Sequence, residues 1–511
     1  MKNILLTLIL SLVLIQMLQA QWTQIGSDIL GDVNGDRLGF RNALAIDSTG
    51  NTIAVGAAYN NNLFPYSGYA RVMDWDGNNW VQRGNDIIGT DTIYEATGYA
   101  VDLSSAGMTL AVSSPWGWNS LGYKCGNVRV FDWDGISWMQ RGSDIEGEGD
   151  PSPLFWGDVF GWSIQLNSTS DYIVIGAPSN SRLPFTQSFQ GHARVYHWDG
   201  AVWNQIGQDI DGPMTFGAGE FGFSVGINNE GDRIIVGGRS YTGLNPSDQD
   251  KGMALALEFN GSVWVPLGDT IFGSNSGDNL GNSVDISGDG NTIVIGAPDA
   301  NNFNGETKIF DWNGLNWIQR GTDILGSSSS NITASGSNIA MSNNGAVLTI
   351  GERGADFNKG AVRSYLWNNN SWQQIDNKIS PPLSSPTAMP GFGWGVDVNF
   401  NGSRMIAASP LDGAGKIRVY ENITLDSSWH CWQSAGCQFA GSNPSFPGQY
   451  ASLSDCQAAC NLTSINTLGN TEKKVLVRTV DVFGKESKEL KNQLMFYIYD
   501  DGTVEKRIII E

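Results

Sequence analysis

A four-strand unit that recurs seven times constrains this chain more than any other feature. Its clearest copy spans residues 281 to 324 and holds four short stretches of alternating apolar residues, each bounded by Gly, Asn or Asp. Such stretches are typical of antiparallel strands, and Asn313-Gly314 predicts a tight hairpin between the third and the fourth. One four-stranded sheet cannot bury both of its faces, so the copies must pack on one another.

The copies are counted most easily by the tryptophan of each fourth strand. It recurs at intervals of 53 to 65 residues, as Trp22, Trp80, Trp138, Trp203, Trp264, Trp317 and Trp372. The chain enters the repeats with a lone fourth strand at 22–26 and leaves them near residue 421 after a first, second and third strand. We therefore predict an all-β, seven-bladed β-propeller that is closed by the N-terminal strand.

Two short motifs resemble a known family. Second strands end in Gly-Ala-Pro at 176–178 and 296–298, and first strands open with Phe-Gly or Leu-Gly at 160–161, 221–222 and 280–281. Residues 22 to 421 resemble the FG-GAP repeats of integrin-α-type propellers, in the bacterial variant with a W-x-Q-x-G strand. The resemblance implies the fold and, as an expectation only, adhesion or ligand binding, because one fold serves many functions.

The N-terminus predicts export. Residues 1–20 combine Lys2, an apolar stretch at 4–15 and a small residue at Ala20, which is the pattern of a cleaved signal peptide. The propeller then occupies 21–424, and no stretch of the mature chain predicts a membrane span. We expect a secreted or cell-surface protein. The net charge of −21 argues against nucleic-acid partners, which require a basic surface.

Two small segments follow the propeller. Residues 425–462 hold Cys431, Cys437, Cys456 and Cys460, a density that in an exported chain favours two disulfides of open pairing over a zinc site. Residues 463–511 alternate again, with a hairpin signal at Asp501-Gly502. Their VDVFGKE and FYIYDDGTVEKRIIIE stretches resemble the C-terminal sorting domain of type IX secretion, which implies an outer-membrane secretion machinery as partner. A structural hairpin module is the alternative.

Acidic residues recur just before the first strands, in a place that a propeller would arrange as a ring around its channel. They are Asp36, Glu95, Asp158, Glu220 and Asp278. Such a ring could attract a cation or a basic ligand. Carboxylates that cap turn amides would repeat in the same way, and we favour that interpretation.

Calcium is the cofactor to weigh, since integrin-type blades often carry Asp-rich loops. A hard cation needs several converging oxygen ligands. Asp285, Ser287 and Asp289 keep three oxygen-bearing positions, but Ile293 stands where the final carboxylate should be. We expect no cofactor in most blades, with Ca²⁺ in this loop as the alternative.

The tryptophans divide into two groups. Those in the third and fourth strands recur with the blades, so packing between blades is their expected role. Off the repeat lie Trp116, Trp118, Trp156 and Trp394, which are better candidates for ligand binding because they fall in loops or at strand starts.

No motif of catalysis is present. The chain has three histidines and lacks a nucleophile elbow, an H-E-x-x-H pair and a phosphate loop. We therefore expect a non-catalytic propeller that binds an extracellular protein or glycan. The alternatives are an extracellular hydrolase or lyase acting on polysaccharide, for which facing carboxylates would be needed, and a structural component of a surface layer.

Overall fold

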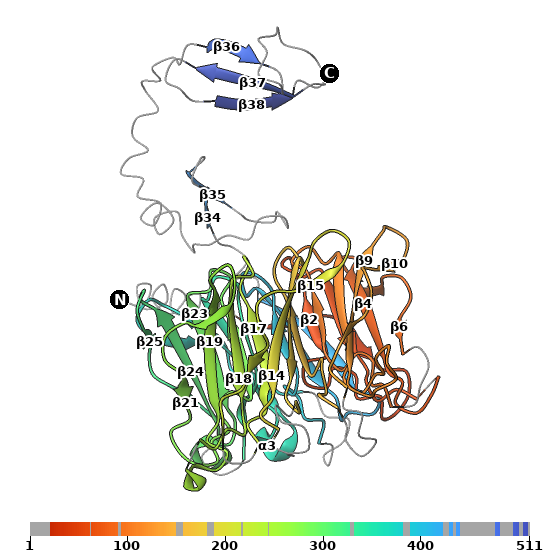
Figure 1. Cartoon of the computed structure of the whole chain (residues 1–511), viewed down its shortest axis with the longest axis vertical. Helices are drawn as coiled ribbons and strands as arrows, with labels where there is room; N and C mark the ends of the chain where they lie inside the picture. The colour runs from red at the N-terminus through yellow and green to blue at the C-terminus, as the bar shows by residue number, and fades with distance from the viewer. Residues whose placement is uncertain are drawn as a thin grey trace, which may run out of the picture. The chain divides into compact units, whose positions relative to one another are not determined.

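The computed structural model describes residues 21–422, apart from 62, 90–93, 150–156, 181–188, 216–217, 244, 328–331 and 382–388, and five strands nearer the C-terminus. The chain divides into two compact units, and the first contains a seven-bladed β-propeller (Figure 1). The predicted signal peptide and Trp156 lie outside the described residues. No helix among the described residues is long and apolar enough to cross a membrane.

Each blade is an antiparallel sheet of four strands. The first strands, which line the centre, are β2 (Leu44–Ile46), β7 (Val101–Leu103), β12 (Ser163–Leu166), β17 (Phe221–Ile227), β22 (Ser283–Ile286), β27 (Ser335–Met341) and β31 (Val396–Val398). The second strands are β3 (Thr52–Gly56), β8 (Thr109–Ser114), β13 (Tyr172–Ala177), β18 (Arg233–Gly238), β23 (Thr292–Ala297), β28 (Val347–Glu352) and β32 (Arg404–Ser409). These strands are buried on both faces, because a neighbouring blade covers each side.

The third and fourth strands form the outer hairpin of each blade. The third strands are β4 (Tyr69–Trp75), β9 (Asn127–Trp133), β14 (His192–Trp198), β19 (Met253–Phe259), β24 (Glu306–Trp312), β29 (Ala361–Trp367) and β33 (Lys416–Glu421). The fourth strands are β5 (Trp80–Gln82), β10 (Trp138–Gln140), β15 (Trp203–Gln205), β20 (Trp264–Pro266), β25 (Trp317–Gln319), β30 (Trp372–Gln374) and β1 (Thr23–Leu30). In five blades a two-residue strand continues the edge after a break, as β6 (Ile87–Ile88), β11 (Ile145–Glu146), β16 (Ile210–Asp211), β21 (Ile271–Phe272) and β26 (Ile324–Leu325).

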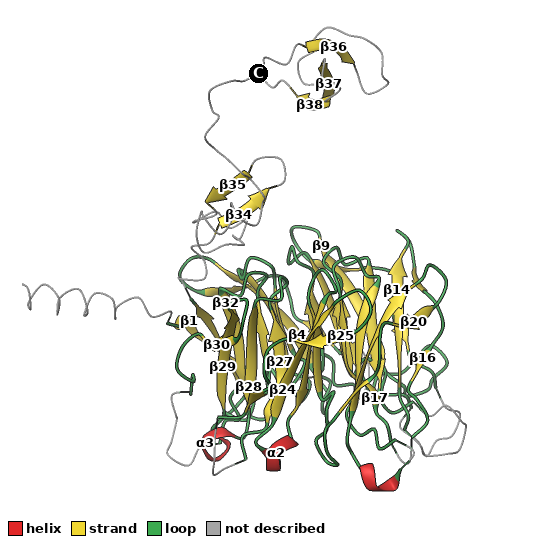
Figure 2. Ribbon diagram, turned by 90° about the vertical axis from the view of Figure 1, so that its left-hand side faces the viewer, coloured by secondary structure: helices red, strands yellow, loops and turns green. Residues whose placement is uncertain are grey.

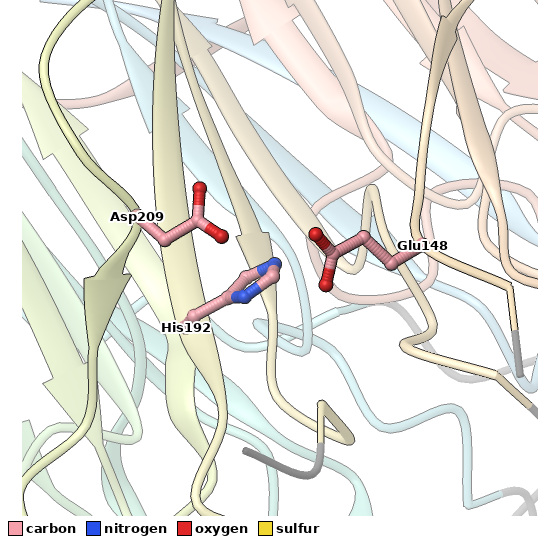
Figure 3. A group of neighbouring side chains, drawn as sticks. All are labelled: Glu148, His192 and Asp209. Atoms are coloured by element: carbon pink, nitrogen blue, oxygen red, sulfur yellow. The ribbon is translucent and has the colours of Figure 1, made fainter. Parts of the chain in front are cut away.

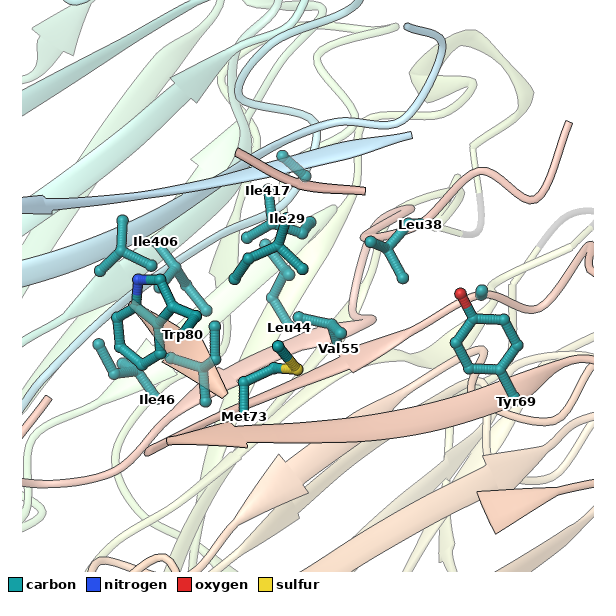
Figure 4. Close-up of a cluster of buried hydrophobic side chains, with 14 residues drawn as sticks. Ile29, Leu38, Leu44, Ile46, Val55, Tyr69, Met73, Trp80, Ile406 and Ile417 are labelled. Carbon is teal, nitrogen blue, oxygen red and sulfur yellow. The ribbon is translucent and has the colours of Figure 1, made fainter. Parts of the chain in front are cut away.

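The predicted closure by the N-terminal strand is confirmed. Strand β1 pairs with β33, from Thr23 opposite Glu421 to Leu30 opposite Lys416, and completes the sheet β1-β33-β32-β31. Figure 4 shows the core beside this joint, where Ile406 and Ile417 from the end of the propeller pack with Ile29, Leu44 and other residues from its beginning. The ring is therefore held shut by both strand pairing and apolar burial.

The fourth-strand tryptophans join the blades, as predicted. The indole Nε1 of Trp138 donates to the carbonyl oxygen of Arg83 in the preceding blade at 3.1 Å, and Trp203 donates to Arg141 at the same distance. The same bond recurs at four more junctions, from Trp80 to Ile25, Trp264 to Ile206, Trp317 to Leu267 and Trp372 to Arg320. Each of these indoles also packs on an aromatic ring of its own third strand.

The W-x-Q-x-G pattern has a physical reason at each position. The glycine has a positive φ and lies under the tryptophans of the next blade; a Cβ at Gly142 would come within 2.7 Å of the Trp198 ring. Because the edge turns there, the glutamine side chain can reach the aspartate that follows, as Gln140 does to Asp144 at 2.8 Å. The motif therefore encodes the blade junction.

The two ends of the propeller carry different loops. The first strands all run in the same direction through the ring, so the loops after the second and the fourth strands gather on one face. The short elements η2 (Pro246–Asp248), α2 (Ala300–Phe303) and α3 (Ala355–Asn358) belong to loops after second strands, and Figure 2 shows α2 and α3 on the same face. On the opposite face the described loops are tight hairpins.

Strands nearer the C-terminus are described by their backbones alone. Strands β34 (Trp429–Trp432) and β35 (Gly436–Phe439) pair, and β36 (Leu476–Val480), β37 (Leu494–Tyr499) and β38 (Val504–Ile508) form an antiparallel sheet in that order. Cys431 and Cys437 fall on β34 and β35, whereas Cys456 and Cys460 lie outside the described residues. The predicted disulfides and sorting domain stay predictions.

Candidate functional site

A narrow channel runs along the axis of the propeller, because the first strands lie side by side in a closed ring from β2 to β31. Two small cavities lie within it, of about 120 and 100 Å³, and three aspartates line both. We call the end where the first strands begin the channel mouth, and the end where they finish the far end.

The three aspartates, Asp102, Asp285 and Asp397, occupy the same position in β7, β22 and β31. Each accepts a backbone N–H from the next blade: Asp102 from Leu166 at 2.6 Å, Asp285 from Met341 at 2.8 Å and Asp397 from Ile46 at 2.9 Å. Gln165 makes the equivalent bond to Ile227 at 2.6 Å. These side chains therefore join first strands that share no ladder hydrogen bonds.

Burial makes these carboxylates costly to ionise. Desolvation raises the pKa of Asp102 to about 7 and that of Asp285 to about 6, and backbone N–H donors offset part of the effect. The pKa of Asp397 is raised well above its usual value, first by desolvation and also by the charges of Asp102 and Asp285. The channel interior is thus a set of hydrogen-bonded acids that share one low-dielectric space.

The far end is drawn together by hydrogen bonds between neighbouring turns. The backbone N–H of Ser48 donates to Ser105, and that of Gly288 donates to Asn343 at 2.7 Å. The side chains of Asn229 and Asn343 also exchange two hydrogen bonds, of 3.1 and 2.8 Å, above Gly288. A Cβ at Gly288 would come within 2.0 Å of the Asn343 side chain, so the glycine makes room for this bridge.

The channel mouth is lined by aromatic rings. Phe40, Tyr99, Trp162, Phe223 and Trp394 each stand one residue after the glycine that opens a first strand, in five different blades. Their ring centroids are close: 5.0 Å between Phe40 and Trp394, 4.7 Å between Tyr99 and Trp162, and 5.6 Å between Trp162 and Phe223. The equivalent residues of the other two blades are Asn282 and Ser337.

Three arginines join these rings. The guanidinium carbon of Arg41, from the first blade, lies 5.5, 5.9 and 5.6 Å from the ring centroids of Phe40, Trp162 and Phe223 and thus reaches across the mouth. Arg239 lies 4.1 Å from the Phe223 centroid, and Arg353 lies 5.1 Å from that of Trp394. Each contact falls within the range of cation–π attraction.

The five acids of the predicted ring precede the first strands, and three of them accept backbone N–H groups of loops. Asp36 accepts the N–H groups of Asp32 and Val33, Asp158 that of Glu148, and Asp278 that of Asn275. Glu220 accepts from Arg239 and Ser240, and Glu95 is buried. Desolvation raises the pKa of Asp158 to about 7. The contacts of Asp36, Asp158 and Asp278 are those of acids that cap turns.

The predicted calcium ligands do not converge. Asp285 points into the channel and accepts N–H groups from Ile286 and Met341. Ser287 instead donates to Asp289 at 2.5 Å and accepts the N–H of Thr292, which closes the hairpin. The Asp285 carboxylate is thus engaged by the backbone of the next blade, while Ser287 and Asp289 are bonded to each other and within their own hairpin.

Two of the off-repeat tryptophans lie at the mouth, and a third is exposed elsewhere in a loop. Trp394 lies at the mouth, and Trp116 packs edge-on against Tyr99 beside it, with centroids 5.4 Å apart. Trp118 is 47% exposed. Two of the predicted residues therefore belong to one aromatic cluster with the arginines.

Glu148, His192 and Asp209 form the one group of potential metal ligands found among the described residues (Figure 3). Arg194 already occupies this position, because it forms ion pairs with both Glu148 and Asp209. Burial, and then the charge of Arg194, lowers the pKa of His192 to about 4. A cation would have to displace the guanidinium, so we assign the group a structural role.

Sequence reasoning missed the three arginines and four of the five rings, Phe40, Tyr99, Trp162 and Phe223. The sequence did hold a signal for two of the arginines: Arg239 and Arg353 stand directly after second strands, where Pro115, Pro178 and Pro298 stand in sister blades.

No protein-family model matches the chain, and a search of curated proteins finds no relative.

Proposed function

We propose that this chain is an exported, non-catalytic β-propeller that binds an extracellular glycan or protein at the channel mouth. The observation that carries the proposal is the cluster of rings and guanidinium groups there. Aromatic and arginine side chains dominate recognition surfaces, since they offer large contact areas and directional donors. Long loops frame this face, whereas the described loops of the opposite face are tight hairpins.

The export part of the proposal rests on the sequence of the two ends. A signal peptide at 1–20 and a type IX sorting segment within 463–511 would deliver an FG-GAP-like propeller to the cell surface or the medium. Cell fractionation tests this part, with the mature chain expected outside the cytoplasm. Retention of the full-length chain in the cytoplasm would contradict it.

Tryptophan fluorescence of the full chain, titrated with a panel of neutral and acidic oligosaccharides, tests the binding part. We expect a ligand whose affinity falls about tenfold or more in Trp394→Ala, as for loss of a central aromatic contact. Trp118→Ala is the matched control, because Trp118 is exposed and is not in ring contact with the mouth. Equal losses in the two variants would contradict binding at the mouth.

No observation favours the hydrolase as a second candidate. Asp36, Asp158 and Asp278 bond to loop amides and Glu220 bonds to Arg239, while the three aspartates of the channel bond to the backbone of the next blade.

A further inference from the structure

Arg41, Arg239 and Arg353 come from blades 1, 4 and 6 and meet at one aromatic cluster. We propose that these arginines bind the anionic group of an acidic sugar, whose ring stacks on the aromatic side chains of the channel mouth. This inference names the ligand class for the binding function proposed above and rests on it.

Two of the three arginines lack a counter-charge. Most arginines elsewhere in the propeller are paired with carboxylates, for example Arg71 with Asp86 at 2.7 Å and Arg418 with Asp28 at 2.8 Å. The exceptions among the described residues are Arg129, which donates to the Ile88 carbonyl at 2.9 Å, and Arg37, whose guanidinium carbon lies 4.6 Å from the Tyr59 ring centroid. Arg41 and Arg353 have no ion pair or hydrogen bond with any described residue, and Glu220 takes only the Nε of Arg239. The chain has 51 acidic and 30 basic residues, so carboxylates are plentiful, and two arginines without an ion pair at one place are unexpected.

This arrangement costs energy. Burial lowers the pKa of Arg353, and the charges of Arg41 and Arg239 lower it further, while the charge of Asp299 offsets part of the effect. Arg41 also has a φ of 60°, in the left-handed region that is strained for a residue with a Cβ. A bound anion would relieve the repulsion between the guanidinium groups and would accept paired hydrogen bonds from their planar forks.

Further aromatic rings lie where the rest of the sugar chain would extend from the mouth. From Phe40 a row of rings continues outward through Tyr59, Tyr66 and Tyr94, with successive centroids 5.6, 5.7 and 5.4 Å apart. Tyr66 and Tyr94 stack and are 39% and 44% exposed. Because aromatic faces carry the negative part of the ring quadrupole, they attract the C–H faces of sugars. Phe40, Tyr59 and Tyr66 meet edge to face, so the exposed pair of Tyr66 and Tyr94 is the part of this row that would offer a contact to a further sugar ring.

The test compares one polymer in two charge states. The full chain is titrated with oligogalacturonate and with its methyl ester, in which each carboxylate is neutral, and binding is followed by calorimetry. We expect the ester to bind at least about tenfold more weakly, which corresponds to about 1.4 kcal/mol. Arg353→Gln and Arg239→Gln should each weaken the acid form by a similar factor. Arg83→Gln is the control: it removes the same charge from a residue that pairs with Asp74 at a blade junction.

Each outcome decides between the proposals. Equal binding of acid and ester, lost in Trp394→Ala, would overturn the anionic site and leave binding at the mouth intact. Preference for a sulfated galactan oligosaccharide would support the anionic site and identify sulfate as its source. Binding of polyglutamate in place of every sugar would overturn the sugar assignment. Failure of all these probes would overturn the inference together with glycan binding at the mouth. Thermal unfolding of each variant shows whether a loss reflects misfolding.

Discussion

The blade junctions and the channel mouth use the same residue types in opposite ways. At six junctions a tryptophan bonds to a carbonyl of the preceding blade, and the neighbouring arginines pair with aspartates, as Arg141 does with Asp132. At the mouth, aromatic residues differ from blade to blade, and Arg41 and Arg353 form no ion pair with a described residue, whereas Arg239 pairs with Glu220 through its Nε alone. Residues that repeat with the blades hold the ring together, and residues that break the repeat are the ones available to a ligand.

The strongest test of this contrast is Trp203→Ala. The variant loses a large, partly buried ring and the bond to the Arg141 carbonyl, so the free energy of unfolding should fall by about 3 kcal/mol, the lower end for a tryptophan in a core. Chemical denaturation measures the loss. Ligand affinity below the unfolding transition should stay unchanged, and a parallel loss of affinity would show that junction and mouth are not separable.

The channel acids predict a pH-dependent effect of intermediate size. The folded pKa of Asp102, about 7, lies above its unfolded value, so the native state binds more protons between about pH 4 and 7, and its stability falls as pH rises through that range. Asp102→Asn removes this dependence. The free energy of unfolding of the variant, taken relative to that of wild type, should be higher at pH 8 than at pH 5 by more than about 1 kcal/mol.

Asp76→Asn is the control for that comparison. Asp76 is exposed in a turn, where hydrogen bonds from the N–H groups of Asn79 and Asn78 lower its pKa. Its ionisation is therefore complete well below pH 5, and the variant should show no change in relative stability from pH 5 to 8. If the stability of Asp102→Asn relative to wild type also stayed constant from pH 5 to 8, that result would contradict the raised pKa of Asp102.

A smaller effect separates the seventh junction from the other six. Asp376 replaces the usual glycine there, and the buried indole nitrogen of Trp22 has no hydrogen-bond partner among the described residues. Trp203→Phe should cost about 1 kcal/mol more than Trp22→Phe in denaturation experiments, because only the former loses a hydrogen bond. Equal costs would mean that the indole bonds contribute nothing.

The sequence predicts the junctions well and the mouth poorly. Trp138, Gln140 and Gly142 recur in register, so repetition alone reveals the blades, the closure and the packing role of the tryptophans. Repetition cannot show which way a strand residue points: Asp285 reads as a loop ligand, although its side chain faces the channel. Nor can it show that Arg239 and Arg353 meet Arg41, because only closure of the ring brings blades 1, 4 and 6 to one axis.

The central claim is that the arginines of the mouth serve a ligand rather than the fold. The most direct measurement is the thermal midpoint of wild type and Arg353→Gln, each with and without oligogalacturonate. We expect the thermal midpoint of unliganded Arg353→Gln to equal or exceed that of wild type, because the substitution removes a desolvated charge that is repelled by Arg41 and Arg239, and only wild type to gain stability with the oligosaccharide. A clear loss of stability in unliganded Arg353→Gln, with an undiminished ligand shift, would contradict the claim.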